Sequence, residues 1–252
     1  MSLLDPELML RAYSLGVFPM ADSRDADKVF WVEPRRRAII PLEDFHPSRT
    51  LRKRIRSGAF TVTRDVAFAD VVLQCAARDE TWINDEIEQS YLQLHRLGHA
   101  HSVECWSDGA LVGGLYGVKL GAAFFGESMF SHRTDASKVA LAWLVARLKA
   151  GRFQLLDCQF MTEHLRSLGA IEISQKDYLA RLSAALSPAA AVGAVAGGVA
   201  GGGAGAASFA GATSLPGVDF TELDRLLAMD PAFTVDASAS GCFISQLFGQ
   251  TS

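Results

Sequence analysis

The chain has 252 residues, of which 49% are hydrophobic and 21% are charged, and its formal net charge is -4. These values are typical of a globular protein with a substantial apolar core, organised as one large domain or two smaller ones. The negative net charge excludes a protein that binds polyanions over its whole surface, but it leaves room for a local basic patch.

The first half of the chain predicts mainly helices. Asp5 and Pro6 form a helix start, Ser48 caps a strongly basic helix, and Gly98 ends a later amphipathic one. The elements expected here are a helix at 5–16, a strand around 30–31, a basic helix over 48–56, a strand at 60–63, a helix from 65 or 68 that Trp82-Ile83 interrupts, and a helix at 86–97.

From His101 the hydrophobic period changes to two, which indicates an antiparallel meander. The segment from Gly126 to Ser131 puts the Glu127 carboxylate between apolar residues and a Gly/Ser turn. A helix over 135–148 is apolar almost all round, so we expect it to be deeply buried. The remaining expected elements are strands at 102–106, 111–119, 122–125, 153–160 and 170–173, a helix ending at 168–169, and a helix over 174–186.

Residues 189–212 consist almost entirely of Ala and Gly. A membrane span is the alternative interpretation, but the many glycines make the segment weakly hydrophobic, and a flexible linker is favoured. We therefore expect a small N-terminal domain at 1–33, a main domain at 34–187, a linker at 188–213 and a C-terminal tail at 214–252. The predicted fold class is α+β with a mixed, largely antiparallel sheet, and the order of elements resembles the GNAT-type acyltransferase fold.

Asp157 and Gln159 are the polar side chains of a largely apolar predicted strand. Residues two apart on a strand share a face, so both point the same way, opposite to Leu156, Cys158 and Phe160. A carboxylate and a carboxamide are costly to bury without partners, which makes them candidates for chemistry. The alternative is a structural Asp that caps a neighbouring loop beside a Gln bonded to the sheet edge.

Basic residues gather between Arg35 and Arg64, while the rest of the chain is acidic. This patch predicts either a docking surface for phosphates or simply a solvated helix face. The basic residues in this range are Arg35, Arg36, Arg37, Arg49, Arg52, Lys53, Arg54, Arg56 and Arg64.

The cysteines and histidines indicate no metal or disulfide chemistry. The four cysteines are scattered without a CxxC pair and are interpreted as thiols of a reducing cytoplasm. His95, His99 and His101 are closely spaced, but no Cys or carboxylate completes a convincing ligand set, so no metal site is predicted. The N-terminus shows no basic-then-apolar signal pattern, and we expect a cytoplasmic protein that does not enter the membrane.

Six motifs, in chain order, resemble the bacterial leucyl/phenylalanyl-tRNA–protein transferases over about residues 5–185. They are Ala12-Tyr13-x-x-Gly16-Val17-Phe18-Pro19, Thr81-Trp82-Ile83, Gly98-His99-Ala100-His101-Ser102-Val103-Glu104, Leu111-Val112-Gly113-Gly114-Leu115-Tyr116-Gly117, Gly126-Glu127-Ser128-Met129-Phe130-Ser131 and Asp157-Cys158-Gln159.

The resemblance implies a reaction and its partners. Leu or Phe moves from leucyl-tRNA or phenylalanyl-tRNA to the α-amino group of a protein that starts with Arg or Lys, which marks that protein for degradation by the N-end rule pathway. No cofactor and no metal are implied, and we expect a monomer.

The resemblance also implies roles for individual residues. Asp157 orients Gln159 and is a candidate to take up the proton, Gln159 contacts the incoming amine, and Glu127 holds the cationic acceptor N-terminus. The implied aminoacyl pocket comprises Leu115, Phe124, Met129, Leu141, Leu144 and Leu156, which would be plain core residues without the resemblance. Tyr13, Trp82 and Tyr91 would frame the terminal adenosine, and Arg49, Arg52, Lys53, Arg54 and Arg56 would hold the tRNA phosphates.

The chain departs from the family pattern at Met20, where Trp is usual after Phe-Pro, and at Leu144 and Leu148, where Phe is common. Two rival functions share parts of the pattern. A CoA-dependent acetyltransferase would need a glycine-rich turn, but residues 131–137 contain no glycine. A non-catalytic RNA-binding protein would need the basic patch but not the combination of Asp157, Gln159 and Glu127.

Overall fold

The computed structural model describes residues 3–78, 80–187, 217–229 and 237–248. Its centre is a seven-stranded sheet with the order β4-β5-β6-β7-β8-β3-β9. Among the described strands, β7 and β8 are parallel and the other neighbouring pairs are antiparallel. The bounds of its strands are β3 Arg36–Ile40, β4 Thr61–Arg64, β5 Ala100–Ser107, β6 Ala110–Leu120, β7 Ala123–Ser131, β8 Leu155–Gln159 and β9 Ile171–Ser174. A separate two-stranded sheet pairs β1 (Phe18–Met20) with β2 (Phe30–Val32).

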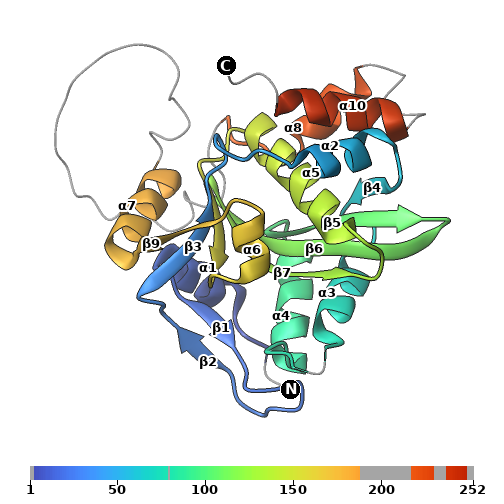
Figure 1. Ribbon diagram of the computed structural model, residues 1–252. Coiled ribbons are helices and arrows are strands. Elements are labelled where there is room, and N and C mark those ends of the chain that lie inside the picture. Colours follow the sequence, from blue (N-terminus) through green and yellow to red (C-terminus); the bar gives the residue numbers. More distant parts are fainter. Residues whose placement is uncertain (1–2, 79, 188–216, 230–236, 249–252) are drawn as a thin grey trace, which may run out of the picture.

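Helices cover both faces of the large sheet (Figure 1). One apolar core joins the sheet to α1, α3, α4 and α7, and the other joins it to α2, α5, α8 and α10. Sheet residues alternate between the two cores: Tyr116 and Phe125 face the first, whereas Leu115 and Phe124 face the second. The helix bounds are α1 Pro6–Ser14, α2 Arg49–Arg56, α3 Phe68–Ala76, α4 Asp85–Arg96, α5 Ala136–Ala150, α6 Glu163–Ser167, α7 Gln175–Leu186, α8 Glu222–Ala228 and α10 Ala237–Leu247.

This arrangement confirms the predicted α+β class and the mixed, largely antiparallel sheet. Local signals in the sequence act as expected. Asp5 accepts a hydrogen bond from the Leu8 amide at 2.9 Å and caps α1, and Ser48 caps α2 in the same way from Leu51 at 3.2 Å. Helix α5 is buried along nearly its whole length, because the sheet lies under one side and α2, α8 and α10 cover the others.

Two stretches of strand were not predicted. Residues 36–40 form strand β3, between β8 and β9. The strand expected at 122–125 continues as β7 to Ser131, because cross-strand pairing with β6 extends from Gly126 to Ser131. Glycine and serine in this stretch weaken its strand signal, and tertiary pairing overrides that local preference.

Strands β7 and β8 separate before they end. Their parallel pairing runs from Ala123 opposite Leu155 to Phe125 opposite Asp157, and β7 then continues to Ser131 beside β6 alone. The split between the two strands is where the main cavity of the protein lies.

The described part of the C-terminal tail packs onto the main domain, with α10 against α2 and α8 against α5 (Figure 1). Phe220 is 2% exposed and stacks on Phe124 with ring centroids 5.4 Å apart. The predicted linker at 188–213 lies outside the described residues. None of the described helices is both long enough and apolar enough to cross a membrane.

Candidate active site

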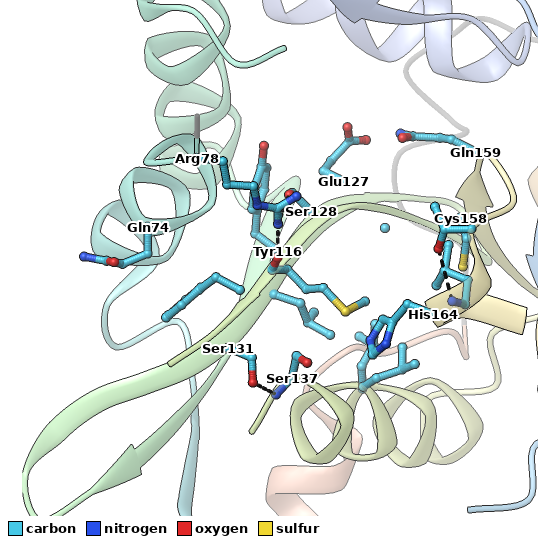
Figure 2. A pocket seen from close by; sticks show the side chains of 18 of the residues that line it. Gln74, Arg78, Tyr116, Glu127, Ser128, Ser131, Ser137, Cys158, Gln159 and His164 are labelled. Atoms are coloured by element: carbon cyan, nitrogen blue, oxygen red, sulfur yellow. Dashed lines mark hydrogen bonds between the residues drawn. The ribbon is translucent and has the colours of Figure 1, made fainter. Parts of the chain in front are cut away.

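A cavity of about 700 Å³ occupies the split between β7 and β8. All residues from Gly126 to His132 line it, as do Cys158, Gln159 and Phe160 on the opposite side. A consecutive run along one strand means that the strand edge, and not one of its faces, borders the cavity. Figure 2 shows lining side chains that come from β6, β7, β8, α3, α5 and α6.

One end of the cavity is apolar and matches most of the predicted aminoacyl pocket. Its described wall includes Leu115, Met129, Leu141, Leu144 and Leu156. Phe124 is the predicted member that does not line it. That ring is fully buried behind the wall and packs on Phe220, so it supports the pocket without a surface of its own.

Glu127 stands at the polar end of the cavity because of a β-bulge in β7. Tyr116 pairs with Ser128 and Gly117 pairs with Gly126, so Glu127 is the extra residue between them. Gly117 is required opposite this bulge, since a Cβ there would lie 2.2 Å from the Phe125 carbonyl oxygen. The bulge turns the Glu127 side chain toward α1 and α4.

Tyr13 and Tyr91 hold the Glu127 carboxylate. The Tyr13 hydroxyl donates to Oε1 and the Tyr91 hydroxyl donates to Oε2, each at 2.7 Å, and the two hydroxyl oxygens are 2.8 Å apart. Both tyrosines are 0% exposed, so neither ring has a free face on which a base could stack. Tyr13 and Tyr91 do not line the cavity; of the predicted aromatic set, half-buried Trp82 does.

Burial dominates the electrostatics of Glu127 and raises the pKa of its carboxyl to about 7. Hydrogen bonds from Tyr13 and Tyr91 and the nearby Gln159 amide act in the opposite direction, and the charge of Asp157 adds to the rise. A carboxyl group with such a pKa exchanges its proton near neutral pH, which is the range that acid–base chemistry requires.

Asp157 lies outside the lining of the cavity and is 0% exposed. Arg37 donates to its two carboxylate oxygens at 2.6–3.1 Å, and the Tyr178 hydroxyl donates to Oδ2 at 2.9 Å. Its Oδ1 also accepts the backbone N–H of Gln159 at 2.8 Å. These contacts neutralise the buried charge, and they make Asp157 an anchor for Gln159.

Gln159 ends β8 in a left-handed conformation, with φ 62°. This conformation is uncommon for a residue with a side chain, and the Asp157 contact holds it in place. The ring of the next residue, Phe160, lies 5.7 Å from the Phe18 ring, and Phe160 lines the cavity together with Leu156 and Cys158. Figure 2 shows the Gln159 amide facing the Glu127 carboxylate, and its buried Nε2 has no hydrogen-bond partner among the described residues.

The sequence analysis missed several polar residues of the site. Arg37 and Tyr178 fix Asp157, and Tyr116 and Arg78 line the cavity. The run Arg36-Arg37-Ala38-Ile39-Ile40 carried a usable signal, because its apolar half suggests a strand. No sequence pattern shows that the partner of Arg37 lies 120 positions away.

The predicted basic patch divides into separate groups. Arg36, Arg37 and Arg64 form ion pairs with Glu172, Asp157 and Asp224, respectively. On α2 the buried face carries Leu51 and Ile55, whereas Arg49, Lys53 and Arg56 are exposed together on the other face. Arg52 and Arg54 are partly buried; Arg52 donates to the Pro47 carbonyl at 2.9 Å, and Arg54 lies 4.0 Å from Asp135.

Two of the three closely spaced histidines, His95 and His101, contact polar groups of the protein itself. The Nδ1 of His101 is 2.8 Å from Asp65, and the Nδ1 of His95 is 2.8 Å from the Ala100 carbonyl oxygen. Within the described part of the chain, no group of three His, Cys, Asp or Glu residues is arranged to hold a metal ion.

The chain is similar in sequence to proteins of one family. Residues 39–183 match the family model of leucyl/phenylalanyl-tRNA protein transferase, and residues 2–35 match the model of its N-terminal domain. A curated leucyl/phenylalanyl-tRNA–protein transferase of Rhizorhabdus wittichii is 59% identical over 256 residues, which cover 100% of both chains. One from Zymomonas mobilis is 60% identical over 73% of this chain and 70% of its own. A third, from Cereibacter sphaeroides, is 62% identical over 73% of this chain and 86% of its own. This chain therefore belongs to the leucyl/phenylalanyl-tRNA–protein transferase family.

Proposed function

We propose that this protein transfers a leucyl or phenylalanyl group from aminoacyl-tRNA to the α-amino group of a protein whose first residue is Arg or Lys. Family membership supports the reaction class. The observation that carries the proposal for this chain is a single cavity with an apolar wall that leads to Glu127 and Gln159.

The apolar end of the cavity fits the aminoacyl group. Leu115, Met129, Leu141, Leu144 and Leu156 surround space for an unbranched-at-Cβ apolar side chain. A volume of about 700 Å³ exceeds that of one leucyl group, which leaves room for the ester and part of the terminal adenosine. Trp82 offers an aromatic surface for that adenosine, and the exposed face of α2 offers Arg49, Lys53 and Arg56 for the acceptor-stem phosphates.

The polar end fits the acceptor. Glu127 is the one carboxylate among the described lining residues, so it is the group that can bind a cationic N-terminus. Gln159 contacts the amine, and its free Nε2 is the donor available to the carbonyl oxygen as negative charge develops there. Asp157 acts as a positioning residue, because it reaches Gln159 through the backbone N–H and does not border the cavity.

The chemistry balances without a further reactant. The neutral amine attacks the ester carbonyl, a C–N bond forms, and the C–O bond to the adenosine ribose breaks. The amine loses one proton and the ribose oxygen gains one. The ester is already activated, so the step itself consumes no nucleotide.

We further propose that the protein acts as a monomer in the cytoplasm and that its products enter the N-end rule pathway. The free state of Cys75, Cys105, Cys158 and Cys242 supports a reducing compartment. Sedimentation of the full chain with and without tRNA tests the monomeric state, and a dimer would contradict it.

Binding of CoA is disfavoured by the start of α5. Asp135 stands at its N-cap, 3.1 Å from Lys138, where a CoA pyrophosphate would need glycine amides and no acidic neighbour. We expect no measurable binding of acetyl-CoA in calorimetry.

The decisive experiment is transfer of labelled leucine from charged tRNA to a peptide that begins with Arg. The same peptide acetylated at its N-terminus is the control, because it has no free amine. We expect Gln159→Ala to lower the turnover by roughly 10²-fold through loss of a preorganised contact. Lys176→Ala, on the exposed surface of α7, is the matched variant that should transfer normally. Failure of the wild type, or full activity of Gln159→Ala, would contradict the proposal.

A further inference from the structure

Glu127, Tyr13 and Tyr91 form a closed triangle of oxygen contacts. The two tyrosine–carboxylate distances are 2.7 Å, and the distance between the tyrosine hydroxyls is 2.8 Å. Each of these distances is typical of an O–H···O hydrogen bond, which requires one proton between the two oxygens. All three side chains are buried: both tyrosines are 0% exposed and Glu127 is 7% exposed.

The protons of the two tyrosines do not suffice for three hydrogen bonds. A phenol hydroxyl carries one proton, and an ionised carboxylate carries none. If both tyrosines donate to Glu127, no proton lies between their hydroxyls. If one tyrosine donates to the other, a Glu127 oxygen faces a hydroxyl without a proton. Any arrangement with an ionised Glu127 leaves one of the three close contacts without a hydrogen bond.

A third proton on Glu127 completes the triangle. One of the two tyrosine-to-carboxylate hydrogen bonds then reverses: the carboxyl group donates to that tyrosine, that tyrosine donates to the other, and the second tyrosine donates to the remaining carboxyl oxygen. We propose that Glu127 is protonated in the free site, closing this ring of three hydrogen bonds, and that binding of a cationic acceptor N-terminus releases one proton.

The second half of this proposal rests on the proposed function. A charged ammonium entering beside Glu127 favours the carboxylate, because an adjacent opposite charge stabilises it. The acceptor amine must later become neutral to attack, and Glu127 is then the adjacent group that can take its proton. An α-amino group has an ordinary pKa of about 7.7–8.0, and the bound ammonium lowers the pKa of Glu127 below its free-site value of about 7, so this transfer is uphill until the forming C–N bond makes the amine more acidic.

The other groups around Glu127 are consistent with a proton held there. Tyr116, on β6, has a buried hydroxyl without a hydrogen-bond partner among the described residues, and its pKa is raised by burial and by Glu127. From β8, the charge of Asp157 favours neutral Glu127, whereas the Gln159 amide favours its ionised form. Two cations are near Glu127 among the described residues: the Arg37 guanidinium, on β3, which Asp157 binds directly, and Arg78, which lines the same cavity and donates to the Ser128 hydroxyl and the Met129 carbonyl oxygen.

Infrared spectroscopy of the full chain tests the proton without any substrate. The difference between the wild type and Glu127→Gln should contain the carbonyl band of a protonated carboxyl group at about pH 6, and this band should vanish with a midpoint near 7. Glu7→Gln, an exposed carboxylate on α1, is the matched control and should give no such band at the same pH. Absence of the band in the Glu127 difference spectrum would overturn the proposal.

Calorimetry tests the release. An Arg-starting peptide is titrated into the wild type at about pH 6 in two buffers with different heats of ionisation, and we expect nearly one proton released per peptide bound. Glu127→Gln should show no linked proton. If the peptide binds and is aminoacylated but no proton is exchanged, the proposed proton release is wrong. If no transfer occurs at any pH, the proposed function fails instead. The infrared result decides the protonation of Glu127 in either case.

Discussion

At the residue scale, the site depends on buried polar groups that satisfy one another. The Asp157 carboxylate is 0% exposed. It accepts hydrogen bonds from the Arg37 guanidinium, the Tyr178 hydroxyl and the backbone N–H of Gln159. Burying this charge costs energy that only these partners offset. The sequence predicts Asp157 and Gln159 on one strand. No local pattern pairs Asp157 with Arg37, because the two residues are 120 positions apart.

Arg37→Met should therefore destabilise the protein strongly. The change leaves Asp157 buried without its cation, and we expect a loss of roughly 3–5 kcal/mol in the free energy of unfolding. Arg36→Met is the matched control, because the Arg36 side chain is 63% exposed and its pair with Glu172 should contribute within about 1 kcal/mol. Urea denaturation measures both variants, and equal losses would contradict the assigned role of Arg37.

Glu127 makes stability depend on pH in a defined direction. Its folded-state pKa of about 7 exceeds the ordinary 4.5, so the folded protein binds this proton more tightly than the unfolded chain. The contribution is complete below about pH 4.5 and is lost as the pH rises through 7, a change on the order of 3 kcal/mol.

Glu127→Gln should remove that dependence, because the carboxamide stays neutral. We expect the melting temperature of the variant, relative to that of the wild type, to rise as the pH increases from about 5 to about 8. Thermal unfolding of both proteins across that range measures this difference. If the melting temperatures of the two proteins change with pH in the same way, Glu127 does not titrate in this pH range.

At the element scale, β7 and α2 show what periodicity can and cannot predict. The alternating pattern of β7 breaks at residue 126, because a bulge inserts Glu127 between Gly126 and Ser128. Helix α2 is the opposite case. It is predicted as a basic helix and forms one, and the structure adds that Leu51 and Ile55 are buried whereas Arg49, Lys53 and Arg56 are exposed.

Replacing Arg49, Lys53 and Arg56 together by Ala should weaken tRNA binding and make it less sensitive to salt. If each side chain contacts one phosphate, the slope of log K against log salt should fall by about 2–3 units. Lys176 and Arg181, exposed on α7, provide a control pair whose replacement should leave the slope unchanged. Filter binding over a range of salt concentrations measures both, and an unchanged slope in the triple variant would exclude α2 as the tRNA surface.

At the scale of the whole molecule, the described C-terminal segments are part of the fold. Asp224 on α8 accepts from Arg147 at 2.5 and 2.9 Å and from Arg64 at 2.8 Å, so it ties α8 to α5 and β4. The Arg147 side chain is 5% exposed and depends on this carboxylate for its charge compensation. The tail thus completes the second apolar core, in which Phe220 and Ile244 are buried.

Asp224→Ala should loosen this association. Arg147 would keep a buried charge with fewer acceptors, and we expect a loss of roughly 2–3 kcal/mol in the free energy of unfolding. Glu222→Ala, on the same helix, is the control. It removes the ion pair with Arg225, whose side chain is 66% exposed, and should change the free energy of unfolding by less than about 1 kcal/mol. Chemical denaturation compares the two, and protection of α8 in hydrogen exchange reports whether the helix detaches.

The sequence by itself determined the local features of this protein: the helix caps, the buried helix α5, the position of Asp157 and Gln159 on one strand, and the motifs of the family. These follow from short-range spacing, because 3.6-residue and two-residue periods and capping side chains act within a few positions. Only the tertiary structure decided that Arg37 neutralises Asp157 and that two buried tyrosines form hydrogen bonds with Glu127. It also decided that β7 and β8 separate and leave the cavity between them. These contacts join residues 36 to 120 positions apart, and chain topology selects them from many pairings that the local pattern permits equally.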